Sequence, residues 1–290
     1  MEVTLLGTGS PVPNLDRAGT AYTVSVDGTT YMIDCGPRAV YELMENGIDP
    51  ASITDLLFTH HHVDHNAAFP HFAIAGWTSG RESLTVYGPD GTDNLLEALY
   101  TVYEDDIAYR KEVGYSGEGI EDIDCVRVDA GFELERDDLT VTAMPVDHSI
   151  ETYAYRFEHD DCAVVFSGDT QPLDRLGEFA SGADVLVHDA HLAPVGEPPG
   201  DGFVWERYTT AYSEQLKDGL QKTHSTPEQA GEVAAAAGVE ALVLTHFPPY
   251  RDEAEVRGAA AAEFDGTVHV GRDGLALSIE KSAVRHRANV

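Results

Sequence analysis

Short apolar runs recur along the chain, and each ends in polar residues or glycine. Runs this short, rich in β-branched and aromatic residues, predict buried strands rather than helices. We therefore expect strands at residues 3–6, 20–26, 29–34, 53–58, 84–87, 139–144, 152–157, 163–166, 185–188, 241–244, 267–270 and 275–279. Turn signals at Asp27-Gly28, at residues 159–161 and at Asp273-Gly274 predict three hairpins, the last of them between the final two strands.

Apolar residues at helical spacing predict helices between many of these strands. Residues 37–46 begin with Pro37 and stop before Gly47, which are favoured residue types at the first turn and just past the end of a helix. The other helices are expected at residues 66–76, 94–109, 173–180 and 226–237. No linker or internal repeat divides the chain, so we expect one domain over residues 1–290.

The net charge is unusual. The chain has 18 basic and 51 acidic residues, a formal charge of −33, and the acids are scattered through every segment. Such a surface favours a protein that stays soluble in high salt, where its self-repulsion is screened, and this indicates a halophile. An unusually acidic mesophilic protein is the alternative. The charge also opposes tight binding to a polyanion, because phosphate contacts need clusters of Lys and Arg.

Three features bear on the cellular location. Cys35, Cys125 and Cys162 lie far apart without CxxC spacing, which fits a reducing compartment. The N-terminus lacks the basic and long apolar segments of a signal peptide. No apolar stretch approaches the roughly 20 residues that a membrane span requires. We expect a soluble cytoplasmic protein that does not bind a membrane.

The strand at residues 53–58 is followed directly by His60, His62, Asp64 and His65. Three imidazoles and a carboxylate supply nitrogen and oxygen donors for a borderline metal such as zinc. Four donors within six residues cannot all comfortably bind one tetrahedral ion, so the spacing indicates two adjacent ions. An exposed polar loop is the alternative, and it is disfavoured because histidine is rare in ordinary loops.

The motif His60-x-His62-x-Asp64-His65 resembles the signature of the metallo-β-lactamase superfamily. Further motifs of that family follow in the expected order, around Asp34, His148, Asp169 and His246. The resemblance spans nearly the whole chain. It implies the four-layer αβ/βα sandwich of the metallo-β-lactamase fold, with a dinuclear metal site between two sheets.

The same resemblance implies the roles of these residues. One ion is held by His60, His62 and His148, the other by Asp64, His65 and His246, and Asp169 bridges the two. The ions are expected to be two Zn²⁺, with Mn²⁺ or Fe as alternatives. A metal-bound hydroxide attacks the substrate, Asp64 both ligates and hydrogen-bonds that hydroxide, and Asp34 orients the metal loop from behind.

Two later stretches narrow the family. His188-Asp189-Ala190-His191 and His224-Ser225-Thr226 resemble the His-Glu-Ala-Thr and His-Ser-Thr motifs of the branch that contains ribonuclease Z and the arylsulfatase-like hydrolases. The resemblance implies that Asp189 orients His224, which helps bind the phosphate and protonates the leaving oxygen. The alternative for His224 is a residue at the N-terminal end of a helix.

The sequence departs from ribonuclease Z in three places. The segment between His148 and Asp169 has room for only one hairpin, where ribonuclease Z carries a long basic arm that grips tRNA. Asp189 replaces the usual glutamate. An insertion at about residues 193–222 contains Trp205, Tyr208 and Tyr212, and these aromatics fit a lid over the site, a homodimer interface or packing onto the core.

We therefore expect a metal-dependent hydrolase that acts on a small-molecule or short ester substrate, with phosphodiesters favoured by the His224 motif. Hydrolysis of a sulfate ester, as in the arylsulfatase-like enzymes, or of a lactone is the first alternative. A tRNA 3′ processing endonuclease is the second, disfavoured by the missing arm and the negative charge. A non-catalytic metal-binding scaffold is the alternative from another class, and the seven intact ligand positions oppose it.

Overall fold

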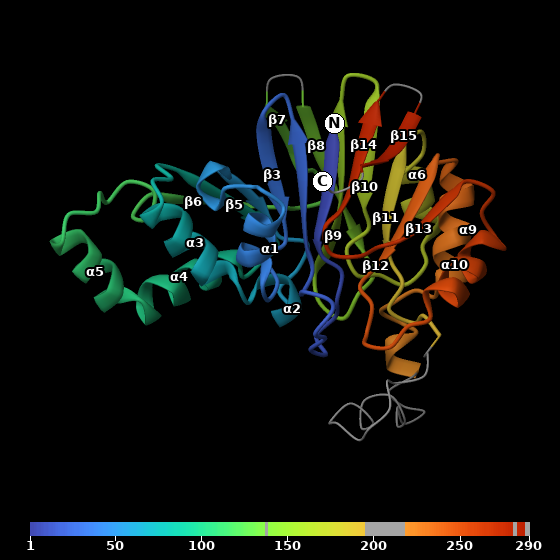
Figure 1. Ribbon diagram of the computed structural model, residues 1–290, viewed down its shortest axis with the longest axis horizontal. Helices are drawn as coiled ribbons and strands as arrows, with labels where there is room; N and C mark the ends of the chain where they lie inside the picture. Colours follow the sequence, from blue (N-terminus) through green and yellow to red (C-terminus); the bar gives the residue numbers. More distant parts are fainter. Residues whose placement is uncertain (137–138, 195–217, 281–282, 288–290) are drawn as a thin grey trace.

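The computed structural model describes residues 1–136, 139–194, 218–280 and 283–287, and it contains two large β-sheets that face each other (Figure 1). The first sheet has the strand order β15-β14-β1-β2-β3-β4-β5-β6. Its strands are β1 (Glu2–Gly7), β2 (Ala21–Val26), β3 (Thr29–Ile33), β4 (Asp55–Leu57), β5 (Leu84–Gly88), β6 (Ile123–Arg127), β14 (Leu275–Glu280) and β15 (Ala283–Arg287).

The second sheet has the order β13-β12-β11-β10-β9-β8-β7. Its strands are β7 (Glu133–Arg136), β8 (Leu139–Val146), β9 (Thr152–His159), β10 (Cys162–Phe166), β11 (Val185–Asp189), β12 (Ala241–Thr245) and β13 (Thr267–Val270). Strands β10 to β13 run parallel to one another, whereas β7 to β10 are antiparallel.

Helices cover the outer face of each sheet, on opposite sides of the molecule in Figure 1. The first sheet carries α1 (Ala39–Glu45), α3 (Phe69–Thr78), α4 (Thr92–Val102) and α5 (Glu104–Glu112), and the second carries α6 (Asp174–Phe179), α9 (Pro227–Ala237) and α10 (Glu253–Ala261). Each set buries its apolar residues against its own sheet, and a third apolar cluster fills the space between the sheets. The predicted four-layer αβ/βα sandwich is therefore confirmed.

Strand β11 shows how the sequence specifies this layering. Val185 and Val187 point into the cluster between the sheets, while Leu186 points into the cluster beneath the helices of the second sheet. A parallel strand that is covered on both faces is apolar throughout. Across the gap between the sheets, the rings of Tyr22 and Phe166 stack with centroids 5.4 Å apart.

The predicted elements are mostly confirmed, but two helices are divided. Residues 66–76 form the end of the short helix α2 (Val63–Asn66) and most of α3, and residues 94–109 divide at Tyr103 into α4 and α5. Strands β6, β7 and β15 and helix α10 were not predicted. Strands β6 and β7 are edge strands with mostly exposed residues, and charged residues interrupt their apolar positions, so they lack the apolar runs that predict a buried strand.

The last predicted hairpin is wrong. Its two strands exist, but β13 pairs in parallel with β12, whereas β14 pairs with β1 in the other sheet. The connection between them crosses from one sheet to the other, and its Asp273 carboxylate accepts hydrogen bonds from the backbone N–H of Thr8 and of Ala18. These partners lie more than 250 residues away along the chain, so a local turn signal could not reveal them.

The structure leaves two predictions untested, the insertion and the single domain. Residues 195–217 lie outside the described residues, and with them most of the insertion predicted at 193–222, including Trp205, Tyr208 and Tyr212. Folding as one domain stays a prediction. Among the described helices, none is both long and apolar enough to span a membrane.

Glycines let three backbone segments meet behind the histidine loop. A Cβ atom on Gly36 would lie 2.1 Å from the carbonyl oxygen of Asp64 and 2.6 Å from the carbonyl carbon of Gly19. The neighbouring Cys35 N–H donates a hydrogen bond to the carbonyl oxygen of His65. The end of β3 is thereby joined directly to the loop that carries the histidines.

We predict that Gly36→Ala lowers the free energy of unfolding by roughly 1–3 kcal/mol or more, because the added methyl group meets backbone that cannot move aside alone. Gly258→Ala is the matched control, since Gly258 lies inside α10 and a Cβ there meets no atom within 4 Å. The control should be neutral or stabilising by up to about 1 kcal/mol. Urea unfolding measures both, and similar values for the two variants would contradict the close packing behind the loop.

Candidate metal centre

The seven predicted ligands follow the ends of strands, five of them in loops and Asp64 and His65 in the short helix α2, and the fold brings them together. His60, His62, Asp64 and His65 follow β4, and His148, Asp169 and His246 follow β8, β10 and β12. The carboxyl ends of the parallel strands β10 to β12 share one edge of the second sheet, where sites in α/β folds are commonly found.

The first group of side chains is His60, His62, His148 and Asp169, whose donor atoms lie within 4.8 Å of one another. Nδ1 of His62 lies 3.0 Å from Nε2 of His60 and 3.2 Å from Nε2 of His148. Their rings are steeply inclined to one another, at 69–81°. Inclined imidazoles whose nitrogens converge on one point form an arrangement that suits a tetrahedral ion.

The second group is Asp64, His65 and His246, and all three side chains are buried. Nε2 of His246 lies 3.0 Å from Oδ2 of Asp64, and Nε2 of His65 lies 3.6 Å from the same oxygen. This donor set also suits zinc.

Asp169 lies between the two groups. Its Oδ2 is 3.7 Å from Nε2 of His60 and 3.9 Å from Nε2 of His148 in the first group. The same oxygen is 3.5 Å from Nε2 of His65 and 3.2 Å from Nε2 of His246 in the second group. A carboxylate in this position can reach ions in both groups, as the predicted bridging role requires.

Thr59 and Asp34 hold the rings of His60 and His65 on the side that faces away from the centre. Nδ1 of His65 lies 2.7 Å from Oδ2 of Asp34, and Nδ1 of His60 lies 3.0 Å from the hydroxyl of Thr59. Asp34 also accepts hydrogen bonds from the N–H and the hydroxyl of Thr59. Both imidazoles therefore present Nε2 to the centre, the pattern that outer hydrogen bonds give to metal-ligating histidines.

The outer nitrogens of His62 and His148 are held as well. Nδ1 of His148 donates to the carbonyl oxygen of Thr223 at 2.8 Å, so Nε2 faces the centre. His62 is turned the other way: its Nε2 lies 3.3 Å from the hydroxyl of Ser149, and its Nδ1 faces the centre.

Two buried polar atoms test whether these side chains fit a metal. Within the described part of the chain, Oδ1 of Asp64 and Nε2 of His65 are shielded from solvent and have no hydrogen-bond partner. Leaving such atoms unpaired is unfavourable by about 1–3 kcal/mol each. Both atoms are zinc ligand types in a cluster of further donors, so the residues fit divalent cations.

The charges at the centre lead to the same conclusion. Burial alone would lower the pKa of His65, but Asp169 and Asp34 raise it well above its usual value. Burial also works against protonation of His246, yet the nearby Asp169 raises the pKa of that imidazole to about 10. The carboxylates therefore stabilise positive charge at the centre. Either protons on the imidazoles or metal cations can supply that charge, and the two compete for the same nitrogen atoms.

Two residues of the site have strained backbone. Asp34 has φ of 57° and His246 has φ of 63°, in the left-handed region that favours glycine. Such conformations are unfavourable by roughly 1–3 kcal/mol and concentrate at functional sites. Each lies directly after a strand, where the chain turns to bring its side chain into the centre.

The structure also brings Asp189 and His224 together. Nδ1 of His224 donates to Oδ2 of Asp189 at 2.9 Å, and both side chains are buried. The His224 ring lies 5.0 Å from that of His148 and 5.2 Å from that of His246, measured between centroids. The pairing that the resemblance implied is therefore present beside the ligand cluster.

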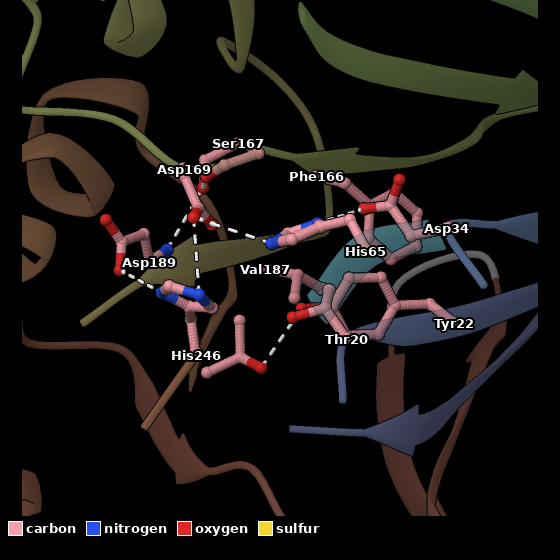
Figure 2. Close-up of a pocket in the computed structure, with 12 residues that line it drawn as sticks. Thr20, Tyr22, Asp34, His65, Phe166, Ser167, Asp169, Val187, Asp189 and His246 are labelled. Carbon is pink, nitrogen blue, oxygen red and sulfur yellow. Dashed lines mark hydrogen bonds and ion pairs between the residues drawn. The ribbon is translucent and has the colours of Figure 1, made fainter. Parts of the chain in front are cut away.

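A small cavity lies between residues of the two sheets, which Figure 2 shows as sticks. Its volume is about 10 Å³, room for about one water molecule. Asp169, His65 and His246 form one side, and the hydroxyl of Tyr22, which lies 3.1 Å from that of Thr245, faces them. Both sheets therefore contribute directly to the floor of the site.

Sequence reasoning missed three contributors. Thr59 and the carbonyl of Thr223 hold ligand histidines, and His191 lies beside His224 with ring centroids 4.3 Å apart. Thr59 precedes the first histidine, so its position was a usable signal. The carbonyl of Thr223 had none, because a backbone group has no residue-type signature.

Comparison with known proteins agrees with the fold. Residues 29–247 match the family model described as Beta-lactamase superfamily domain. The chain therefore belongs to the metallo-β-lactamase superfamily and is a metal-dependent hydrolase of that family. The chain is 33% identical over 282 residues to Ribonuclease Z of Mycobacterium bovis strain BCG / Pasteur 1173P2, covering 94% of this chain and 96% of that protein.

Solved structures show the same fold. The metallo-β-lactamase fold protein YhfI from Bacillus subtilis is 22% identical, with a TM-score of 0.71 and coverage of 95% of this chain and 98% of that one. The short form of human tRNase Z is 21% identical, with a TM-score of 0.67 and coverage of 97% and 100%. A diphosphatase from the PhnP family is 20% identical, with a TM-score of 0.64 and coverage of 96% and 98%.

The hydrogen bond between Asp34 and His65 leads to a prediction. Asp34→Asn keeps the size of the side chain but removes the charge that orients the His65 ring, so the affinity for Zn²⁺ should fall by roughly 10–100-fold. Competition with a chromophoric chelator measures this affinity. Asp265→Asn, a change at an exposed carboxylate in another part of the chain, is the control. Equal affinities of the two variants would show that Asp34 does not support the centre.

Proposed function

We propose that this chain hydrolyses phosphodiesters at a centre of two Zn²⁺ ions. His60, His62 and His148 would hold one ion and Asp64, His65 and His246 the other, with Asp169 shared between them. The observation that carries the proposal is the Asp189–His224 pair, because it adds a proton-transferring group beside the ligand cluster without belonging to either ligand group.

Two divalent ions in these positions would supply an activated water molecule and neutralise charge on the phosphate oxygens. Asp64 has a further role in this proposal. Its Oδ2 faces His246, while its buried Oδ1 has no partner among the described residues. With one carboxylate oxygen on the ion of the second group, the other would accept a hydrogen bond from the attacking water and orient it toward the phosphorus atom.

His224 acts on the leaving group rather than on the attacking water. Asp189 holds Nδ1 of His224, so Nε2 is left for the substrate. As the water oxygen bonds to phosphorus and the bond to the leaving oxygen breaks, a proton on Nε2 passes to that leaving oxygen. Asp189 keeps the ring in the orientation that this transfer requires.

RNA is a second candidate substrate, and the identity to Ribonuclease Z over nearly the whole chain favours it. Two observations oppose a large tRNA. The chain between His148 and Asp169 is occupied by the hairpin β9–β10, and the formal charge is −33. Electrostatic repulsion between a polyanion and this acidic surface favours a small or short phosphodiester as the substrate.

Turnover of a substrate panel tests the proposal. The panel contains bis-p-nitrophenyl phosphate, an aryl sulfate, a lactone and a precursor tRNA, each with Zn²⁺-loaded protein at high salt. The proposal expects the phosphodiester to be cleaved with the highest kcat/KM. Preferred turnover of the sulfate or the lactone would contradict it, and preferred cleavage of the tRNA would establish the second candidate.

The shared position of Asp169 predicts unequal metal losses. Asp169→Ala should release both ions because it contacts both groups, whereas His246→Ala should mainly release the ion of the second group. Elemental analysis after dialysis measures the zinc that remains per chain. Equal losses from the two substitutions would contradict the bridging role of Asp169.

Replacing His224 should separate catalysis from metal binding. We expect His224→Ala to lower kcat by roughly 10²–10⁴-fold with zinc content unchanged, because proton donation to the leaving oxygen is lost. The loss should be smaller for p-nitrophenolate, which departs without a proton, and Asp189→Asn should show a weaker form of the same defect. Loss of zinc, or equal losses for good and poor leaving groups, would rule out this role.

A further inference from the structure

His191 is a buried imidazole that the roles described above leave unused. It follows β11 by two residues and is only 6% exposed. Its backbone N–H donates to Oδ1 of Asp189 at 2.9 Å, which ties it to the same carboxylate that holds His224. Among the described residues, neither ring nitrogen of His191 has a hydrogen-bond partner, and Nδ1 is fully shielded from solvent.

An unpaired imidazole at this position is unfavourable unless a ligand uses it. A buried polar atom without a partner is unfavourable by about 1–3 kcal/mol. The ring of His191 therefore calls for a chemical explanation beyond packing.

The ring of His191 and two other rings form a triangle, in which the centroids of His224 and His246 are 5.2 Å apart. The centroid of His191 is 4.3 Å from that of His224 and 5.0 Å from that of His246, and one nitrogen from each of the three rings lies within 4.8 Å of the others. The three rings are nearly parallel, with interplanar angles of 20–32°.

This orientation argues against a third metal ion. An ion bound to an imidazole lies near the plane of the ring, so rings that share an ion are inclined to one another, as those of His60, His62 and His148 are at 69–81°. Nearly parallel rings instead present their nitrogens side by side. Such a cluster suits a ligand with neighbouring oxygen atoms, each of which takes one nitrogen.

We propose that His191 binds the leaving-group half of the substrate beside His224. This inference rests on the proposed function, in which His224 protonates the departing oxygen. A nitrogen of the His191 ring, which stacks against that of His224, can donate a hydrogen bond to a second oxygen three bonds from the departing one. The site thereby favours leaving groups with a vicinal oxygen, as in a ribose diol, over simple phenols or alcohols.

Two phosphodiesters with leaving groups of nearly equal acidity test the proposal. Bis(2-methoxyphenyl) phosphate carries an oxygen next to each departing oxygen, and diphenyl phosphate does not. For the Zn²⁺-loaded wild-type protein, we expect kcat/KM to be about 3–10-fold higher for the methoxy substrate, the effect of one hydrogen bond. His191→Phe keeps a stacking ring without nitrogens, and it should reduce this ratio to about one.

Three controls accompany the ratio. His71→Phe changes an exposed histidine on α3, and it should keep the wild-type ratio. His191→Thr, whose hydroxyl is too short to reach the second oxygen, should also reduce the ratio to about one and serves if the Phe variant does not fold. Zinc content should be unchanged in every variant, and its loss from the His191 variants would overturn the proposal by assigning His191 to a metal.

The possible failures are distinguishable. If the wild-type protein cleaves neither phosphodiester, the proposed function itself is wrong, and this inference falls with it. If the wild-type protein cleaves both but shows no preference, or if the His191 variants keep the wild-type ratio, phosphodiester hydrolysis stands and only the role of His191 is overturned. If a His191 variant loses the same share of kcat/KM on both substrates, the ratio is unchanged and the role of His191 is likewise overturned. A ring that only supports His224 would slow both reactions alike.

Discussion

The carboxylate of Asp169 is the group around which the rest of the site is arranged. One of its oxygens lies within 3.9 Å of ring nitrogens of four histidines, which arrive from three different loops. Burial alone would raise the pKa of Asp169, but His246 and His65 hold it well below its usual value. A buried carboxylate is stable only when positive charge and hydrogen bonds surround it. The loops at the strand ends supply both.

The two-sheet architecture makes this convergence possible. Neither sheet could form the site alone, since Asp34 and the histidine loop follow strands of the first sheet and Asp169 and His246 follow strands of the second. Contacts between the sheets fix their relative position: the hydroxyl of Tyr155 donates to the carbonyl of Phe58, two residues before His60. The side chains that fill the core therefore also set the distances in the site.

The ligand cluster was accessible from the sequence because its signals are local. Histidines and aspartates of the right types stand directly after apolar runs, and the order of the motifs, through the family resemblance, indicated the partners Asp189 and His224. The features that were missed depend on long-range contacts. Asp273, in the connection between β13 and β14, bonds to the loop after β1, and the stacking of His191 on His224 joins residues more than 30 positions apart.

The central claim is that two metal ions lie on either side of Asp169. Anomalous X-ray diffraction from crystals of the Zn²⁺-loaded protein tests this claim most directly. Data collected on both sides of the zinc absorption edge locate zinc independently of any assumption about ligands. The account predicts two peaks, one beside His60, His62 and His148 and one beside Asp64, His65 and His246, with Asp169 in contact with both. A single peak, or two peaks of which neither contacts Asp169, would contradict it.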